Sequence, residues 1–162
     1  MSVLEIRKFK DPVLRGKSRP IEKIDNGTLK IIGNMIETML ANNGVGLAAP
    51  QVGISKRIFV ARTALKKDGA LVLINPVITY KSSEKERGEE GCLSFPGVFL
   101  NIKRSKEIEV EGRDVNGKKV VIQTNGISAR ILQHEIDHLD GILFYNRLGL
   151  WGQIKFKFKQ WL

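Results

Sequence analysis

Cysteine and histidine are scarce in this sequence of 162 residues, which has one cysteine and two histidines. A single cysteine excludes an internal disulfide, and a lone cysteine is most often a small buried hydrophobe. No apolar run approaches the ~20 residues that a membrane-spanning helix needs. The first ten residues lack the apolar stretch of a signal peptide, so we expect a cytoplasmic protein with no membrane partner.

Acidic residues are also few, at 17 against 27 lysines and arginines, which gives a net charge of +10. This balance favours an anionic partner such as nucleic acid or a ribonucleoprotein, although a solvated basic surface explains it equally well. The hydrophobic fraction of 42% and charged fraction of 27% are those of a soluble globular protein. The length fits one domain over residues 1–162, and no repeat or linker divides it.

Hydrophobic spacing predicts a helix over residues 26–41, with Asp25 or Asn26 as its cap and Asn43-Gly44 at its end. The middle of the chain is rich in strand-forming residues. The expected strands are Lys56–Arg62, Ala70–Tyr80, Lys106–Gly112 and Lys118–Thr124. A turn sequence at residues 114–117 joins the last two and predicts a hairpin.

A second helix is predicted over Ile127–Leu139 and ends at Gly141, a favourable C-terminal cap. A surface helix has one apolar stripe, whereas this one has apolar residues on opposing sides. We therefore expect it to be central and largely buried. Together with the strands, it predicts an α+β fold with mainly antiparallel sheets around a central buried helix.

Both histidines lie on this helix, in the sequence HEIDH. A spacing of four places His134 and His138 on one helix face, close enough to share a metal ion. Glu135 follows the first histidine, where its carboxylate can reach a metal-bound water, as in zinc hydrolases. The alternative is a buried helix with two hydrogen-bonded histidines.

A catalytic metal site of this kind needs a third protein ligand and an open position for water. Asp137, Asp140, Glu89, Glu90 and Cys92 are the candidates. The two aspartates fall away from the histidine face, and Cys92 is the only soft ligand. The glycines and proline around Cys92 favour a shaped loop over a core strand, so we prefer it as a ligand to an inert core residue.

Residues 44–53, GVGLAAPQVG, are small and apolar and permit a close approach to a ligand. Gln51 is the polar side chain of this segment and is free to donate a hydrogen bond. The pattern lacks the features of a dinucleotide site or a P-loop. On its own, the segment is equally compatible with a tight connection from helix to strand.

These three segments together resemble the peptide deformylase family, whose motifs are GxGLAAxQ, EGCLS and HExDH. They occur here in the same order at residues 44–51, 90–94 and 134–138, and the resemblance extends over essentially the whole chain. The resemblance implies an α+β fold and removal of the formyl group from the N-terminal formylmethionine of nascent peptides. It also implies one divalent ion, usually Fe²⁺ in vivo and often Zn²⁺, Ni²⁺ or Co²⁺ after handling.

Carried over by position, the resemblance assigns Cys92, His134 and His138 to the metal and Glu135 to proton transfer. It assigns the Gln51 side chain and the backbone N–H of Leu93 to the oxyanion hole. The expected substrate-binding residues are Val45, Gly46, Gly91, Ile127 and Ile131.

Within that substrate set, Gly46 would hydrogen-bond the substrate backbone. Ile127 and Ile131 share the histidine face and predict an apolar slot that fits an unbranched methionine. Arg104 resembles an arginine that orients Glu90, although both charges could equally be solvated.

Two rival functions remain at this point. An HExxH endopeptidase normally has a His or Glu as its third ligand, and this chain has neither downstream. A basic RNA- or ribosome-binding protein with a structural metal would need a site closed by four ligands. We therefore expect a bacterial-type deformylase, with a ribosome contact through its basic surface and no DNA partner.

The C-terminal segment alternates apolar and basic residues from Ile154 to Lys159. This alternation predicts a strand with one apolar and one basic face. Its lysines at 155, 157 and 159 would either protect an exposed sheet edge or face ribosomal RNA.

Overall fold

The computed structural model describes residues 2–66 and 69–161, with the side chains of residues 157–161 outside the description. Strands occupy the middle of the described chain and helices flank them. In order, the elements are η1 (Pro12–Arg15), α1 (Asn26–Ala41), β1 (Gly46–Ala48), η2 (Ala49–Val52), β2 (Ile58–Ala61), β3 (Leu71–Lys81), β4 (Lys85–Cys92), β5 (Phe95–Ser105), β6 (Glu107–Arg113), β7 (Lys119–Asn125), α2 (Gly126–Leu139), η3 (Phe144–Arg147) and α3 (Leu150–Trp161).

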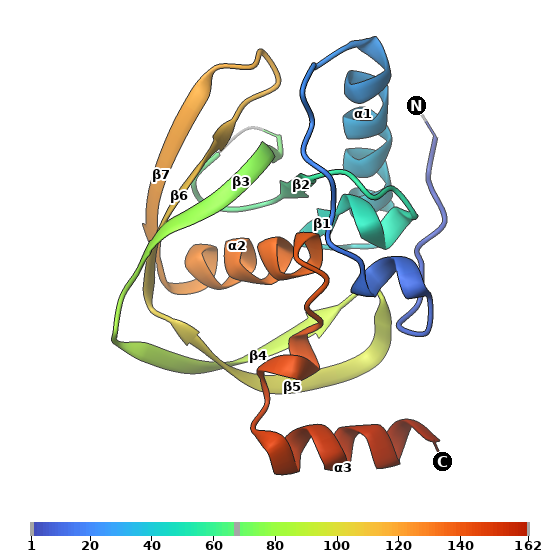
Figure 1. Cartoon of the computed structure of the whole chain (residues 1–162), viewed down its shortest axis with the longest axis vertical. Coiled ribbons are helices and arrows are strands. Elements are labelled where there is room, and N and C mark those ends of the chain that lie inside the picture. Colours follow the sequence, from blue (N-terminus) through green and yellow to red (C-terminus); the bar gives the residue numbers. More distant parts are fainter. Residues whose placement is uncertain (1, 67–68, 162) are drawn as a thin grey trace.

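The strands form two antiparallel sheets. One has five strands in the order β1-β2-β3-β6-β7, and β4 pairs with β5 in the other. The predicted strands correspond to β2, β3, β6 and β7 with bounds shifted by one or two residues, and the predicted hairpin is β6–β7. Figure 1 shows α2 within the curve of these strands, with β3, β6 and β7 on one side and β4 and β5 on another. The predicted α+β class with antiparallel sheets is confirmed.

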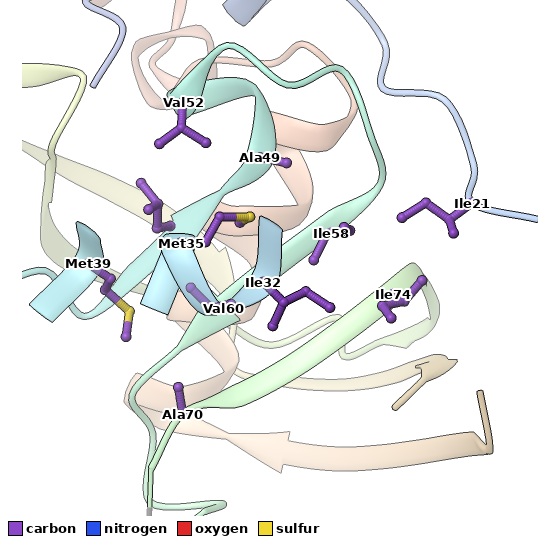
Figure 2. Close-up of a cluster of buried hydrophobic side chains, with 11 residues drawn as sticks. Ile21, Ile32, Met35, Met39, Ala49, Val52, Ile58, Val60, Ala70 and Ile74 are labelled. Atoms are coloured by element: carbon purple, nitrogen blue, oxygen red, sulfur yellow. The ribbon is translucent and has the colours of Figure 1, made fainter. Parts of the chain in front are cut away.

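Helix α1 has the bounds predicted from its hydrophobic spacing. The Asp25 carboxylate caps its start by accepting a hydrogen bond of 2.7 Å from the backbone N–H of Thr28. Its apolar face packs on β1 and β2, where Ile32, Met35 and Met39 meet Ile58 in the buried cluster of Figure 2. This cluster fixes β1, and hence the glycine-rich segment, beside α2.

Helix α2 is buried along most of its length because it packs on both sides. Leu132, Ile136 and Leu139 contact the five-stranded sheet, whereas His134 and His138 belong to the opposite side. Gly141, with φ +72°, reverses the chain after the helix. A side chain there would meet the Arg15 carbonyl oxygen at 2.5 Å, so glycine is needed for the close approach as well as for the turn.

The expected loop around Cys92 is wrong, because Cys92 is the last residue of strand β4. This strand pairs with β5 along its whole length, from Lys85 opposite Ser105 to Cys92 opposite Phe95. Its sequence, KERGEEGC, has no apolar residue before the cysteine and so gives no strand signal. Pairing with β5 and buried hydrogen bonds, which are contacts distant in sequence, determine the conformation.

The expected C-terminal strand is also wrong, because residues 150–161 form helix α3. Phe156 is buried and stacks on Tyr145 with ring centroids 4.9 Å apart, which docks the helix onto the β5 side of the molecule. Lys155 is exposed, and the side chains of Lys157 and Lys159 lie outside the described residues. An alternation of six residues was too short to override this packing. Among the described residues, no helix combines the length and apolarity that a bilayer crossing requires.

Candidate metal centre and active site

The three predicted metal ligands come together from two elements. His134 and His138 lie one turn apart on α2, with ring centroids separated by 4.9 Å. Cys92 reaches them from the end of β4, with its Sγ 3.2 Å from His138 Nε2. All three ligand atoms lie within 4.8 Å of one another, the sole such group found in the part of the chain that the structure describes.

This donor set fits a divalent metal ion. His134 Nδ1 lies 2.9 Å from Glu90 Oε2. Because a carboxylate accepts hydrogen bonds, Nδ1 is the donor in this pair, and Nε2 of the same ring is left to bind a metal. Two imidazole nitrogens and a thiolate suit Zn²⁺ and similar ions, and three protein ligands leave a fourth position for water. His138 Nδ1 is buried without a hydrogen-bond partner among the described residues.

The two buried histidines differ in the direction of their pKa shifts. Burial lowers the pKa of His134, but hydrogen bonds with Cys92 and Glu90 outweigh it and raise the pKa well above its ordinary value. Burial and the charge on His134 lower the pKa of His138.

Glu135 is buried beside the predicted metal ligands. Burial raises the pKa of its carboxyl to about 7, which is where a general base is most effective near neutral pH. Its Oε2 has no hydrogen-bond partner among the described residues, and its Oε1 packs against Gly46. A Cβ at Gly46 would lie 2.2 Å from that oxygen, so glycine at this position makes room for the carboxylate.

Gln51 is buried with its amide group directed at the same centre. Its Oε1 accepts a hydrogen bond of 2.8 Å from the Ala48 N–H, which fixes the orientation of the amide. The Nε2 then lies 3.5 Å from Cys92 Sγ and 3.3 Å from Ser94 Oγ. The predicted donor is therefore held next to the ligand cysteine.

A cavity of about 480 Å³ opens beside these groups. Leu93 lines this cavity. So does every residue predicted to bind substrate, namely Val45, Gly46, Gly91, Ile127 and Ile131. Val45 and Ile127 are exposed at the surface. Phe99, also exposed, and Pro96 belong to the part of the lining that β5 contributes, and sequence analysis missed both because β5 was not predicted.

A buried network of charges supports the centre, and sequence analysis found only its first pair. Arg104 donates two hydrogen bonds of 2.9 Å to Glu90, as the resemblance implied. Burial alone would raise the pKa of Glu90, but hydrogen bonds from Arg104 and His134 lower it to about 2. Arg104 also contacts Asp137. Both carboxylate oxygens of Asp137 accept hydrogen bonds from Arg147.

The other candidate ligands do not belong to the group formed by Cys92, His134 and His138. Asp137 is held by arginines, and Asp140 pairs with Arg57 at 2.7 Å. Glu89 is exposed on β4 and Glu90 binds His134 instead of lying among the ligands. Hydrolases that activate water with a metal need an open three-ligand site beside a general base, and this is the class of protein that the fold and the site define.

Comparison with known proteins identifies the family within that class. The model of the polypeptide deformylase family matches residues 3–152. The chain is 49% identical to the peptide deformylase of Thermodesulfovibrio yellowstonii over 92% of this chain and 91% of the relative, and 50% identical to that of Halothermothrix orenii over 94% and 98%.

Solved structures agree with this assignment. The crystal structure of peptide deformylase from Thermus thermophilus matches with a TM-score of 0.91 at 45% identity, over 98% of this chain and 93% of that one. The Synechococcus elongatus enzyme in complex with actinonin matches with a TM-score of 0.87 at 39% identity, over 96% and 85%. The chain belongs to the polypeptide deformylase family, as its three motifs indicated.

Proposed function

We propose that this chain, as a peptide deformylase, hydrolyses the formamide of N-formylmethionyl nascent peptides at the centre formed by Cys92, His134 and His138. One observation supports this most strongly: the ligand triad, a buried carboxyl with a free oxygen and an oriented amide donor all lie around one cavity. The whole chain, residues 1–162, would act as one catalytic domain in the cytoplasm of a bacterial-type cell.

We assign Cys92, His134 and His138 as the ligands of one divalent ion, Fe²⁺ in the native enzyme, with Zn²⁺, Ni²⁺ or Co²⁺ as substitutes. When bound there, such an ion would make hydroxide available near neutral pH and polarise a carbonyl group. The thiolate and the two neutral imidazoles are supplied by β4 and α2.

Glu135 is the proton carrier in this proposal. Its Oε2, which has no partner among the described residues, accepts a proton from the attacking water. As the bond between the formyl carbon and the amide nitrogen breaks, the same carboxyl delivers a proton to the leaving amine. The products are formate and a free amino terminus. A carboxyl with a pKa of about 7 can both take and return a proton under these conditions.

Gln51 and Leu93 stabilise the oxyanion that forms when the formyl carbonyl is attacked. The amide of Gln51 is fixed in advance by Ala48, so it needs no reorientation during the reaction. Preorganised donors of this type are worth about 10²–10³ in rate each. Leu93 follows Cys92 directly and lines the same cavity, which supports the assignment of its backbone N–H.

Substrate recognition falls to the walls of the cavity. Ile127 and Ile131 offer an apolar surface that an unbranched methionine side chain can fill. Val45, Gly46 and Gly91 present backbone close to the centre, where an extended peptide can form hydrogen bonds.

We further propose that helix α3 contacts the ribosome. Lys155 is exposed on it, and the sequence adds two more lysines and no acidic residue after Asp140. Arg147, also exposed, has its guanidinium paired with Asp137.

A comparison of two substrates tests the proposed activity. A short formylmethionyl peptide and the same peptide without the formyl group are incubated with the enzyme, and formate and peptide fragments are measured. We expect formate from the first peptide and no fragment from either. Cleavage of an internal peptide bond in both would identify an endopeptidase instead.

A further inference from the structure

Arg130 is a buried arginine on α2, one turn before His134, that the mechanism above does not use. Its Nη1 donates to Glu90 Oε1 at 2.9 Å and to the Ile102 carbonyl oxygen at 2.8 Å. Its Nη2 donates to the Glu86 carbonyl oxygen at 3.0 Å. Since residue 86 belongs to β4 and residue 102 to β5, one side chain ties both strands of this sheet to α2.

This connection matters because the proposed metal ligands are divided between the same sheet and helix. Cys92 is on β4, whereas His134 and His138 are on α2. The separation between thiol and imidazoles therefore depends on how the β4–β5 sheet docks against the helix. A displacement of either element would change all the distances from Cys92 to the two histidines together.

Arg130 also completes the hydrogen bonding of the carboxylate that orients a ligand. Glu90 Oε1 accepts from Arg104 and Arg130, and Oε2 accepts from Arg104 and His134. Each oxygen thus has two donors, and the carboxylate has no freedom to turn. Without Arg130, Glu90 Oε1 keeps only the donor from Arg104. The carboxylate can then turn, and Oε2 no longer holds His134 in a fixed orientation.

Gly88 shows that the sheet is shaped around this guanidinium. A Cβ at Gly88 would lie 2.8 Å from Arg130 Cζ and 2.9 Å from its Nε. The backbone of Gly88 does not have a positive φ, so the local conformation alone does not call for glycine. Glycine is needed at position 88 because the Arg130 guanidinium comes so close to β4.

We propose that Arg130 is a positioning residue for the metal centre: by locking Glu90 and docking the β4–β5 sheet on α2, it sets the placement of Cys92 relative to the histidines. The inference rests on the proposed function of this centre as a metal site. A lysine cannot replace the arginine, because its single nitrogen cannot reproduce two planar arms that bind a carboxylate and two separate carbonyl groups.

The test compares Arg130→Lys with Arg57→Lys as a matched control. Arg57 is similarly buried and donates to the carbonyl oxygens of Leu139 and Pro76 and to Asp140, so its hydrogen bonds do not include Glu90, the carboxylate that orients His134. Each protein is stripped of metal and titrated with Co²⁺ against a chromophoric chelator, and the visible spectrum of the Co²⁺ form is recorded. The melting temperature, kcat and KM are measured in parallel.

For Arg130→Lys we expect Co²⁺ affinity to fall by about 10–100-fold, as when groups that orient ligands are removed. The thiolate-to-cobalt absorption should shift, and kcat should fall while KM stays within about twofold. Arg57→Lys should lower the melting temperature but keep wild-type affinity and spectrum. Gly88→Ala, which keeps the arginine but displaces it, should change affinity and spectrum in the same direction by a smaller amount.

Wild-type affinity and spectrum in Arg130→Lys would overturn the proposal, as would a raised KM alone, which would make Arg130 a substrate-binding residue. If Arg130→Lys does not fold, Gly88→Ala decides by the same two measurements. Failure of the proposed function is a separate result, because the wild-type protein would then bind no Co²⁺ through Cys92.

Discussion

Gly46→Ala is a small substitution that should disable the enzyme through its neighbour Glu135. The added methyl group would lie 2.2 Å from Glu135 Oε1, 2.7 Å from Cδ and 3.0 Å from Cγ. Ordinary contact begins at 3.4 Å, so the carboxylate must move by about 1 Å. A misplacement of about 1 Å can cost ~10²-fold in rate.

The substitution keeps the backbone N–H and carbonyl of residue 46, so the proposed hydrogen bonds to substrate remain possible. We therefore expect kcat to fall by ~10²-fold with KM nearly unchanged. The metal content should stay at one ion per chain, because the three atoms nearest to the added methyl group all belong to Glu135. Crowding in this buried strand should cost about 1–3 kcal/mol of stability, which thermal unfolding would detect.

Steady-state kinetics on a formylmethionyl peptide, with metal analysis of the same samples, measures these effects. Gly149→Ala is the control, because a Cβ there meets nothing within 4 Å. It should match the wild type in all respects. A raised KM with unchanged kcat in Gly46→Ala would refute the reasoning, since it would mean that the methyl group obstructs substrate and leaves Glu135 in place.

Three further predictions concern other residues. Glu135→Gln keeps the shape but removes the proton acceptor, so kcat measured on a formylated peptide should fall by ~10²–10⁴ with the metal retained; near-normal turnover would exclude the mechanism. Gln51→Ala should lower kcat and kcat/KM alike by ~10²–10³, and a change in KM alone would assign Gln51 to substrate binding. Changing Lys155, Lys157 and Lys159 to Gln should leave peptide turnover unchanged. It should also make the salt slope of ribosome binding shallower by up to ~0.7–0.9 per lost phosphate contact, whereas identical slopes would remove the ribosome proposal.

Local patterns in the sequence predicted helices α1 and α2 and the pair of histidines in the candidate metal site. The spacing of His134 and His138 is a property of one helix, and α1 has the bounds that its apolar spacing predicted. The β6–β7 hairpin was predictable because its turn sequence is local. Cys92 was selected by elimination and by resemblance, and the structure brings it to the histidines.

What the sequence could not predict depends on contacts between distant residues. Strand β4 has charged residues and glycines where a strand usually has apolar ones, and its pairing with β5 makes it a strand. The role of Asp137 was missed because its arginine partners come from β5 and η3. Helix α3 was mistaken for a strand because the aromatic contact of Phe156 with Tyr145 is not visible in the alternation of residues.

The most direct test of the central claim measures metal content and formate release together in the wild type and in Cys92→Ala. The protein is purified without oxygen, so that Fe²⁺ is retained, and each sample is assayed on a formylmethionyl peptide. We expect one divalent ion per wild-type chain, activity in proportion to bound metal, and loss of both in Cys92→Ala, with affinity declining at low pH as the thiolate is protonated. Full metal content and full activity in Cys92→Ala would contradict the account.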